Sequence, residues 1–177
     1  VTPTVRSNGV LVAQVAPEGG MVSGQSSVVE LDAWNWEDAA YLTDDALHIH
    51  WPDLTIRTWP WSPKPEEQRK TQTEHLNQLK KLFEDAKNYQ IAKAAGKSIQ
   101  TNLTLEAMLP FISTIKPVYI HAQEANQIEA AIHFADQYHL KMILVGGADA
   151  HHCIAHLKKH NIPVVLTATH ALPMRDD

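Results

Sequence analysis

The last third of the chain alternates short hydrophobic runs with segments of helical periodicity. The hydrophobic runs cover residues 117–121, 141–145 and 163–167, and the segments 124–138 and 149–160 lie between them. Strands that are continuously hydrophobic, rather than alternating, are typical of a parallel sheet with both faces covered by helices. The pattern therefore predicts a β-α-β-α-β series and an α/β fold.

The first 64 residues have a different pattern. Strands are predicted over 10–15, 27–31 and 46–51, and a glycine-rich loop over 17–26 joins the first two. This loop has two interpretations that its spacing does not separate: a plain hairpin connection, or a loop that closes over a site. A connector rich in proline and tryptophan, which cannot be regular structure, ends the segment at 58–65.

A long polar helix is predicted from about Glu66 to Ala95, and a shorter helix starts at Asn102. The hydrophobic stripe of the long helix is narrow, so we expect this helix to lie on the surface of the domain. The chain thus divides into a β-rich segment, residues 1–64, and a long helix followed by the βαβαβ series, residues 65–177.

Composition limits the class of protein. With 177 residues, of which 44% are hydrophobic, the chain can bury one sizeable core. The net charge of -5 argues against a nucleic-acid or anionic-membrane surface and favours small-molecule or protein partners. No stretch approaches the roughly 20 apolar residues of a membrane span, so we expect a soluble protein. The single Cys153 does not decide between cytoplasm and periplasm.

Both ends of the chain suggest a piece of a longer protein. The sequence starts on Val1 without a methionine, and it stops soon after the predicted strand 163–167. A parallel sheet that stops there has an open edge, which natural proteins usually cover. We therefore expect an internal fragment, and we expect it to self-associate through exposed sheet edges.

His121 is the first candidate for chemistry. It ends the first strand of the βα series, and α/β folds place reactive groups at the carboxyl ends of their parallel strands. Gln123, Glu124 and Asn126 add polar side chains at the start of the next helix. The competing interpretations are a hydrogen-bonded structural histidine and, for Glu124, a carboxylate that stabilises a helix N-terminus.

His48 and His50 form a second histidine motif. Alternate residues of a strand share a face, so the two imidazoles could bind one metal ion. They supply only two ligands, however, and Trp51 and Pro52 follow them instead of an acidic residue. We interpret them as two half-buried strand histidines on a polar face.

Two further motifs receive structural interpretations. The pair Gly146-Gly147 is interpreted as a tight turn rather than an anion site, because Asp149 at the following N-cap would repel a phosphate. The other motif is a cluster of four histidines, interpreted as a solvated helix surface with only adventitious metal affinity; it comprises His151, His152, His156 and His160.

Several segments together resemble a known family. They are residues 13–29 with the glycine loop, the run Trp34-Asn35-Trp36-Glu37-Asp38, and the later runs 118–122, 143–147 and 162–166. This combination resembles the imidazolonepropionase-related branch of the metal-dependent amidohydrolase superfamily. The resemblance implies a distorted TIM barrel to which residues 97–177 contribute βα repeats. It also implies hydrolysis of C–N bonds in small amides or cyclic amides with one or two divalent metals, zinc first among them.

The resemblance assigns one metal ligand, His121, at the end of the fifth barrel strand. The family's His-x-His pair belongs to the first barrel strand, before the start of this chain, so His48 and His50 do not match it. The sixth-strand histidine falls near Gly146, and the eighth-strand aspartate lies beyond Asp177, so Asp176 and Asp177 do not replace it. The catalytic residues are therefore not assigned, and we expect the fragment alone to be inactive.

Two other functions are compatible with the sequence. A non-catalytic α/β binding domain would receive a small ligand at Gly146-Gly147. An interaction module using Trp51, Trp59 and Trp61 ranks lower, because a proline-rich tryptophan connector also packs against a core.

Overall fold

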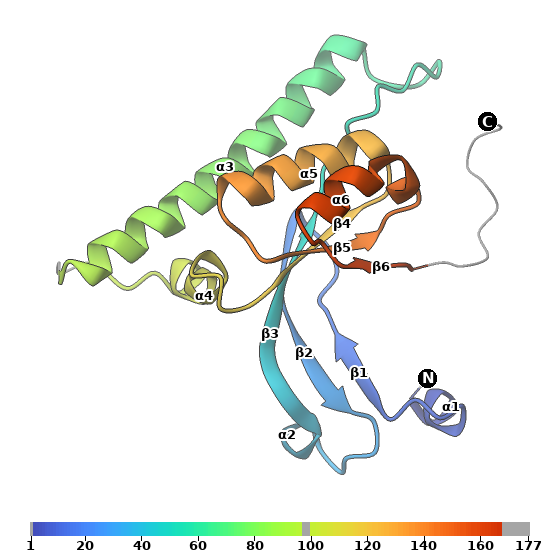
Figure 1. The fold of residues 1–177 in the computed structure, drawn as a ribbon, viewed down its shortest axis with the longest axis vertical. Coiled ribbons are helices and arrows are strands. Elements are labelled where there is room, and N and C mark those ends of the chain that lie inside the picture. The colour runs from blue at the N-terminus through green and yellow to red at the C-terminus, as the bar shows by residue number, and fades with distance from the viewer. Residues whose placement is uncertain (1, 97–99, 168–177) are drawn as a thin grey trace.

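The computed structural model describes residues 2–96 and 100–167. Within them, a single curled sheet of six strands in the order β1-β2-β3-β4-β5-β6 runs through the molecule (Figure 1). The strands are β1 (Val12–Val15), β2 (Val22–Glu30), β3 (Ala40–His50), β4 (Val118–Ala122), β5 (Met142–Gly146) and β6 (Val164–Val165). The helices are α1 (Thr2–Ser7), α2 (Trp36–Ala39), α3 (Pro65–Ala94), α4 (Leu103–Ile112), α5 (Ala125–Gln137), the 3-10 helix η1 (Ala150–Cys153) and α6 (Ile154–Lys159).

The sheet is antiparallel in its first half and parallel in its second. β1, β2 and β3 pair antiparallel, whereas β3 to β6 pair parallel. The predicted parallel series is confirmed, and β3 of the β-rich segment extends it by one strand, with Leu47 opposite Val118 and Ile49 opposite Ile120. The result is a half-barrel, the partial TIM-barrel-like α/β fold that the sequence predicted.

The predicted helices are confirmed where their signals are local. α3 matches its predicted bounds within one residue, and Pro65, whose missing N–H is harmless in the first turn, stands at its start. α4 begins after Asn102, whose side-chain oxygen accepts hydrogen bonds from the backbone N–H groups of Thr104 and Leu105.

Several predicted elements differ from the structure in length or type, and the strands predicted at 27–31 and 46–51 begin earlier, at Val22 and Ala40. The glycine-rich loop is shorter than expected, because β2 already begins at Val22. The predicted helix 149–160 is confirmed in its bounds within one residue, but its first turn is the 3-10 helix η1 and only the rest is α6; the Asp149 carboxylate accepts a hydrogen bond from Ala125 N and none from its own helix. The predicted strand 163–167 pairs only over Val164–Val165. Residues 168–177, with Asp176 and Asp177, lie outside the described residues.

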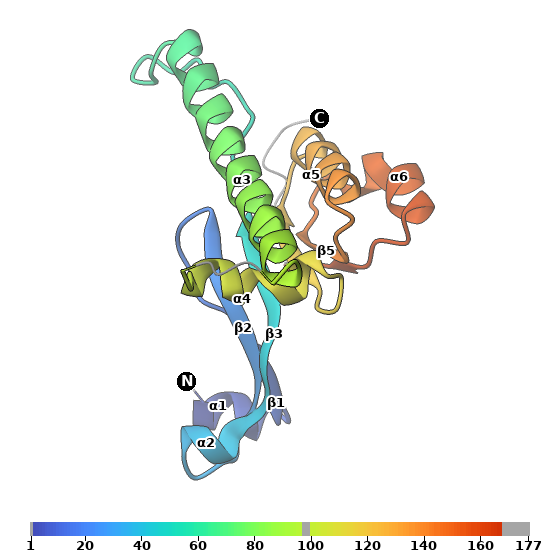
Figure 2. The same ribbon diagram turned by 90° about the vertical axis from the view of Figure 1, so that its left-hand side faces the viewer.

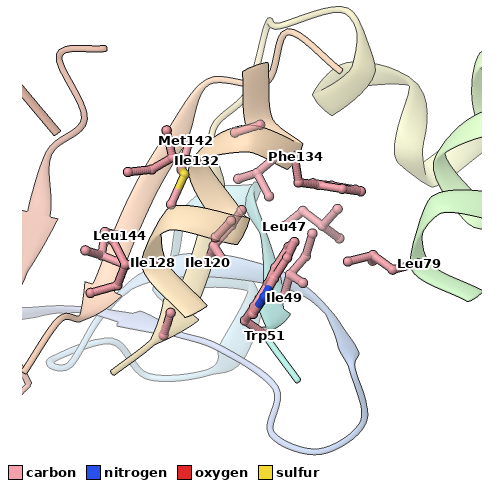
Figure 3. Close-up of a cluster of buried hydrophobic side chains, with 14 of the residues drawn as sticks. Leu47, Ile49, Trp51, Leu79, Ile120, Ile128, Ile132, Phe134, Met142 and Leu144 are labelled. Atoms are coloured by element: carbon pink, nitrogen blue, oxygen red, sulfur yellow. The ribbon is translucent and has the colours of Figure 1, made fainter. Parts of the chain in front are cut away.

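The hydrophobic core lies between one face of the sheet and the helices α3 and α5 (Figure 3). Phe83 of α3 meets Phe134 of α5 edge-to-face, with ring centroids 5.0 Å apart. Burying a large apolar side chain contributes roughly 1.5–3 kcal/mol, so this layer fixes both helices to the sheet. The strands contribute Leu47, Ile49, Val118, Ile120, Met142 and Leu144 to it.

No helix of the described residues is both long enough and apolar enough to cross a bilayer. α3 has the length, but most of its side chains are polar.

Candidate functional site

Four ring side chains meet near the carboxyl ends of β3 and β4. The parallel register places His48 opposite Tyr119 and His50 opposite His121. Register partners, and alternate residues of one strand, point to the same face of a sheet. All four rings therefore project from the face opposite the helices, the inner face of the half-barrel.

His121 lies between the two strand histidines. Its Nε2 is 2.9 Å from Nδ1 of His48, and its ring stacks on His50 with centroids 4.2 Å apart. The His48 ring in turn stacks on Tyr119 at 5.0 Å. The sequence predicted only His121 as a metal ligand and indicated a structural role for His48 and His50. In the structure, all three rings are in contact.

Burial keeps two imidazoles of this cluster, those of His48 and His121, uncharged near neutral pH. Loss of solvent, followed by the charges of His50 and His48, lowers the pKa of His121 to about 4. Burial, followed by the charge of His50, also lowers the pKa of His48. A neutral imidazole has a lone pair, which is the form that binds metals or accepts protons.

Nε2 of His48 is buried and makes no hydrogen bond to the described residues. His48 is 4% exposed rather than half-buried as predicted, and its Nε2 has no hydrogen-bond partner among the described residues. Leaving a buried polar atom in this state costs free energy, so such atoms often mark functional sites.

The cluster fits part of a metal-ligand set. Two nitrogens bound to one tetrahedral zinc at about 2.0–2.1 Å are roughly 3.3 Å apart, slightly more than the 2.9 Å between His48 and His121. Among residues 2–96 and 100–167, no three His, Cys, Asp or Glu side chains are placed to hold one ion together. The described residues therefore supply two converging imidazoles and not a complete site.

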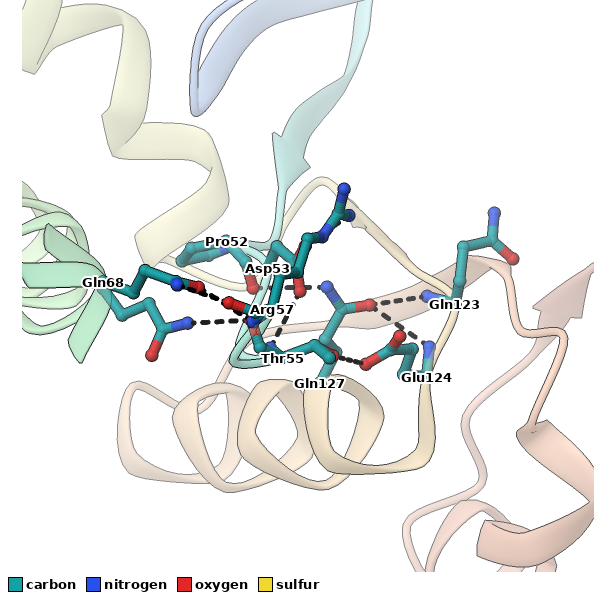
Figure 4. Close-up of polar contacts among 9 residues, drawn as sticks. Pro52, Asp53, Thr55, Arg57, Gln68, Gln123, Glu124 and Gln127 are labelled. Carbon is teal, nitrogen blue, oxygen red and sulfur yellow. Dashed lines mark hydrogen bonds and ion pairs between the residues drawn. The ribbon is translucent and has the colours of Figure 1, made fainter. Parts of the chain in front are cut away.

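A polar network fixes the loops beside the cluster (Figure 4). The Gln127 side-chain oxygen accepts hydrogen bonds from the backbone N–H groups of Gln123, at 3.0 Å, and Glu124, at 3.2 Å. Its amide nitrogen donates to the carbonyl of Pro52, which follows β3. Glu124 caps α5, as its helix-terminus interpretation predicted, and accepts a short hydrogen bond from the Thr55 hydroxyl. The connections after β3 and β4 are thus held together.

Gly146-Gly147 is a tight structural turn, as predicted. Gly146 has φ +99°, and a Cβ there would lie 2.5 Å from Nε2 of Gln123. The Gln123 side-chain oxygen accepts a hydrogen bond from Ala148 N, and Gly147 N donates to the carbonyl of Ala122. The Gln123 side chain therefore occupies the space beside Gly146, and this geometry does not support a ligand site at the turn.

The four histidines at 151, 152, 156 and 160 lie on η1, on α6 and at the end of α6, apart from the group formed by His48, His50 and His121. His151 and His152 are exposed, as expected of a solvated surface. His160 instead lies 2.9 Å from the Asp136 carboxylate, and His156 faces Glu129. Both acidic partners belong to α5, so the histidine spacing alone could not reveal them.

The three tryptophans Trp51, Trp59 and Trp61 differ in burial. Trp51 is buried in the core beside Phe134, whereas Trp59 and Trp61 are exposed and lie against each other. The predicted surface of three tryptophans is therefore reduced to two.

Comparison with known proteins supports the fold. No protein-family model and no curated protein matches the sequence. Among solved structures, the chain is similar to an amidohydrolase from Thermotoga maritima MSB8, with a TM-score of 0.77 and 22% sequence identity. The likeness covers 94% of this chain and 44% of that one, so the chain spans less than half of its length. At this identity the likeness shows the fold alone, a half-barrel that matches part of that structure.

Proposed function

We propose that this chain is part of a metal-dependent amidohydrolase of the imidazolonepropionase-related branch, which hydrolyses C–N bonds in small amides or cyclic amides. The observation that carries the proposal is the contact between two neutral, largely buried imidazoles, His48 and His121. They meet at the carboxyl edge of parallel strands, in a fold shared with an amidohydrolase.

His121 is the proposed metal ligand, and His48 offers the second nitrogen. A divalent metal, zinc by the chemistry of imidazole ligands, would lower the pKa of a bound water and polarise the scissile carbonyl. For both facing nitrogens to present lone pairs, each ring carries its proton on the outer nitrogen, which is Nε2 in His48. The low pKa values keep both rings neutral, so this arrangement requires a change of tautomer and no net loss of a proton.

The remaining side chains position the pair. His50 stacks on His121 and restricts rotation of its ring. Tyr119 supports His48 in the same way. Gln127, in the first turn of α5, fixes the loops that follow both strands and so holds the strand ends that carry the two imidazoles together.

Metal content tests the proposal. We expect the purified protein to bind zinc, and His121→Ala and His48→Ala each to weaken binding by about tenfold or more, the size typical of loss of a direct or supporting partner. His151→Ala removes an exposed imidazole outside the cluster and serves as the control. Zinc content is measured by mass spectrometry after dialysis against a zinc buffer.

Activity is then measured on the longest natural protein that contains this chain, with small cyclic and linear amides as substrates. We expect hydrolysis that a chelator removes and zinc restores. Zinc binding that is unchanged in His121→Ala, or hydrolysis indifferent to both the chelator and this substitution, would refute the assignment.

A further inference from the structure

A three-stranded arm projects from the body of the molecule. It comprises residues 10–15 and 27–45, which form β1, the outer halves of β2 and β3, and α2. Figures 1 and 2 show it extending away from α3 and α5, the helices that cover the core. A small antiparallel sheet needs a hydrophobic face, or packing against a helix, to be stable on its own.

Large apolar side chains are concentrated on the arm. Trp34 is 96% exposed, Trp36 77% and Tyr41 73%. The arm holds eight of the 17 large exposed hydrophobic side chains of the described residues, although it accounts for only 25 residues. Such a concentration of exposed apolar side chains in one small part of a protein often accompanies an interaction site. Besides Trp34, Trp36 and Tyr41, the exposed hydrophobic side chains of the arm are Val10, Leu11, Val12, Val15 and Leu42.

The same arm has a one-sided charge. Residues 10–15 and 27–45 contain six of the chain's 20 acidic residues and none of its Lys, Arg or His. Within the described residues, only Asp32 of these six forms an ion pair, with Arg6 of α1. The other five are Glu30, Glu37, Asp38, Asp44 and Asp45.

We propose that the arm is a docking surface for a partner protein that presents a basic segment rich in arginine and lysine. Arginine stacks on tryptophan and tyrosine faces through cation–π contacts, and its apolar stem packs on the same rings. The surrounding carboxylates supply complementary charge, which speeds association and selects against acidic partners. Aromatic residues and arginine are also the types enriched at the centres of protein interfaces.

The charge pattern disfavours three other occupants: nucleic acid, anionic lipid and a second copy of this chain. Nucleic acid and anionic lipid would be repelled by the six carboxylates, which outnumber the two cations at the arm: Arg6, paired with Asp32, and Lys116, whose ammonium donates to the Asp44 carbonyl. Two arms of identical chains would repel each other for the same reason. The longest helix of a second copy does not match the arm either, because α3 intersperses six Lys and Arg residues with five acidic ones. A basic partner is the occupant that satisfies both the apolar and the acidic surface.

A fluorescent oligo-arginine peptide serves as the probe, and its binding is followed by anisotropy at low salt. A peptide of citrulline, which has the same shape without charge, is the control ligand. We expect only the arginine peptide to bind, and the double substitution Trp34→Ala and Trp36→Ala to weaken it about tenfold through loss of two exposed cation–π contacts. Trp59→Ala with Trp61→Ala removes two exposed tryptophans elsewhere and should leave the affinity unchanged.

A second variant tests the charge without changing the shape of the arm. Glu37→Gln with Asp38→Asn should also weaken binding and reduce its dependence on salt. Three results would overturn the proposal: no binding of the arginine peptide, equal losses in both tryptophan variants, or a dimer that Trp34→Ala and Trp36→Ala dissociate while the peptide fails to bind. The last result would assign the arm to a second copy of the chain.

Discussion

Nδ1 of His48 lies 2.9 Å from Nε2 of His121, across two neighbouring parallel strands. In a hydrogen bond between two imidazoles, one ring donates and the other accepts, so the accepting ring must be neutral. Burial favours this state in both rings by lowering their pKa values. The contact therefore couples the proposed metal site to pH even in the metal-free protein.

The metal-free protein should lose stability between pH 6.5 and pH 4. The pKa of His121 falls from 6.5 to about 4 on folding. In this window the unfolded chain binds more protons than the folded one, so stability rises with pH and is complete above 6.5. We expect a loss on the order of 1 kcal/mol from pH 7 to pH 5, after discounting for solvent screening of the partly exposed ring.

Urea unfolding of chelator-treated protein at several pH values measures this loss. His121→Ala should flatten the dependence, whereas His75→Ala, which removes an exposed imidazole from α3, should retain the slope of the unsubstituted protein. Equal slopes in all three proteins would show that His121 does not cause the loss.

The sequence predicted elements whose signals are local. Continuous hydrophobic runs identified β4 and β5, and the positions of Pro65 and Asn102 matched the starts of α3 and α4. Each of these depends on propensities within a few residues. The α/β class and the half-barrel follow from the order of such elements, which is why both were predictable.

The contact between His48 and His121 could not be predicted from local sequence signals. Residues 51–117, which include the helices α3 and α4, separate β3 from β4 in the sequence. The local sequence of β3 carries no signal that this strand pairs with the parallel series. By its local pattern the strand belongs to the β-rich segment 1–64, and in that segment His48 and His50 have no histidine neighbour. The pairing depends on the whole sheet, and so does the burial of His48.

Phe83→Ala should destabilise the fold by about 3–5 kcal/mol, the usual range for removing a buried phenylalanine. The side chain is fully buried and contacts both Phe134 and Tyr138 of the α5 segment, so the substitution leaves a cavity between α3 and α5. Ile91→Ala, at an exposed position of α3, should cost much less. Chemical denaturation followed by circular dichroism compares the two, and similar losses would mean that α3 does not dock through Phe83.

Gln127→Ala should cost about 2–3 kcal/mol. Gln127 is 8% exposed, and its side chain binds the backbone N–H groups of Gln123 and Glu124 and the carbonyl of Pro52. Alanine leaves these three groups without this partner, and each unsatisfied buried group carries a penalty. Gln137→Ala at the exposed end of α5 is the control. A loss no larger than that of the control, measured by thermal and urea unfolding, would contradict the role of this network.

Gly146→Ala tests whether the Gln123 side chain fills the space beside this glycine. The substitution meets two costs: a positive φ of +99°, and a Cβ that would lie 2.5 Å from Nε2 of Gln123. Gly19 has nearly the same φ, +98°, with nothing within 4 Å of its Cβ position. Gly19→Ala therefore measures the backbone cost alone, about 1–2 kcal/mol.

We expect Gly146→Ala to cost more than Gly19→Ala, by on the order of 1 kcal/mol, because Gln123 must move and give up its hydrogen bond to Ala148 N. Adding Gln123→Ala to Gly146→Ala removes the clash, so the stability difference between the double variant and Gln123→Ala alone should match the cost of Gly19→Ala. Urea unfolding of the four variants completes the double-mutant cycle. Strictly additive effects of Gln123→Ala and Gly146→Ala would show that the two residues do not compete for the same space, and the turn after β5 would then owe its shape to the backbone alone.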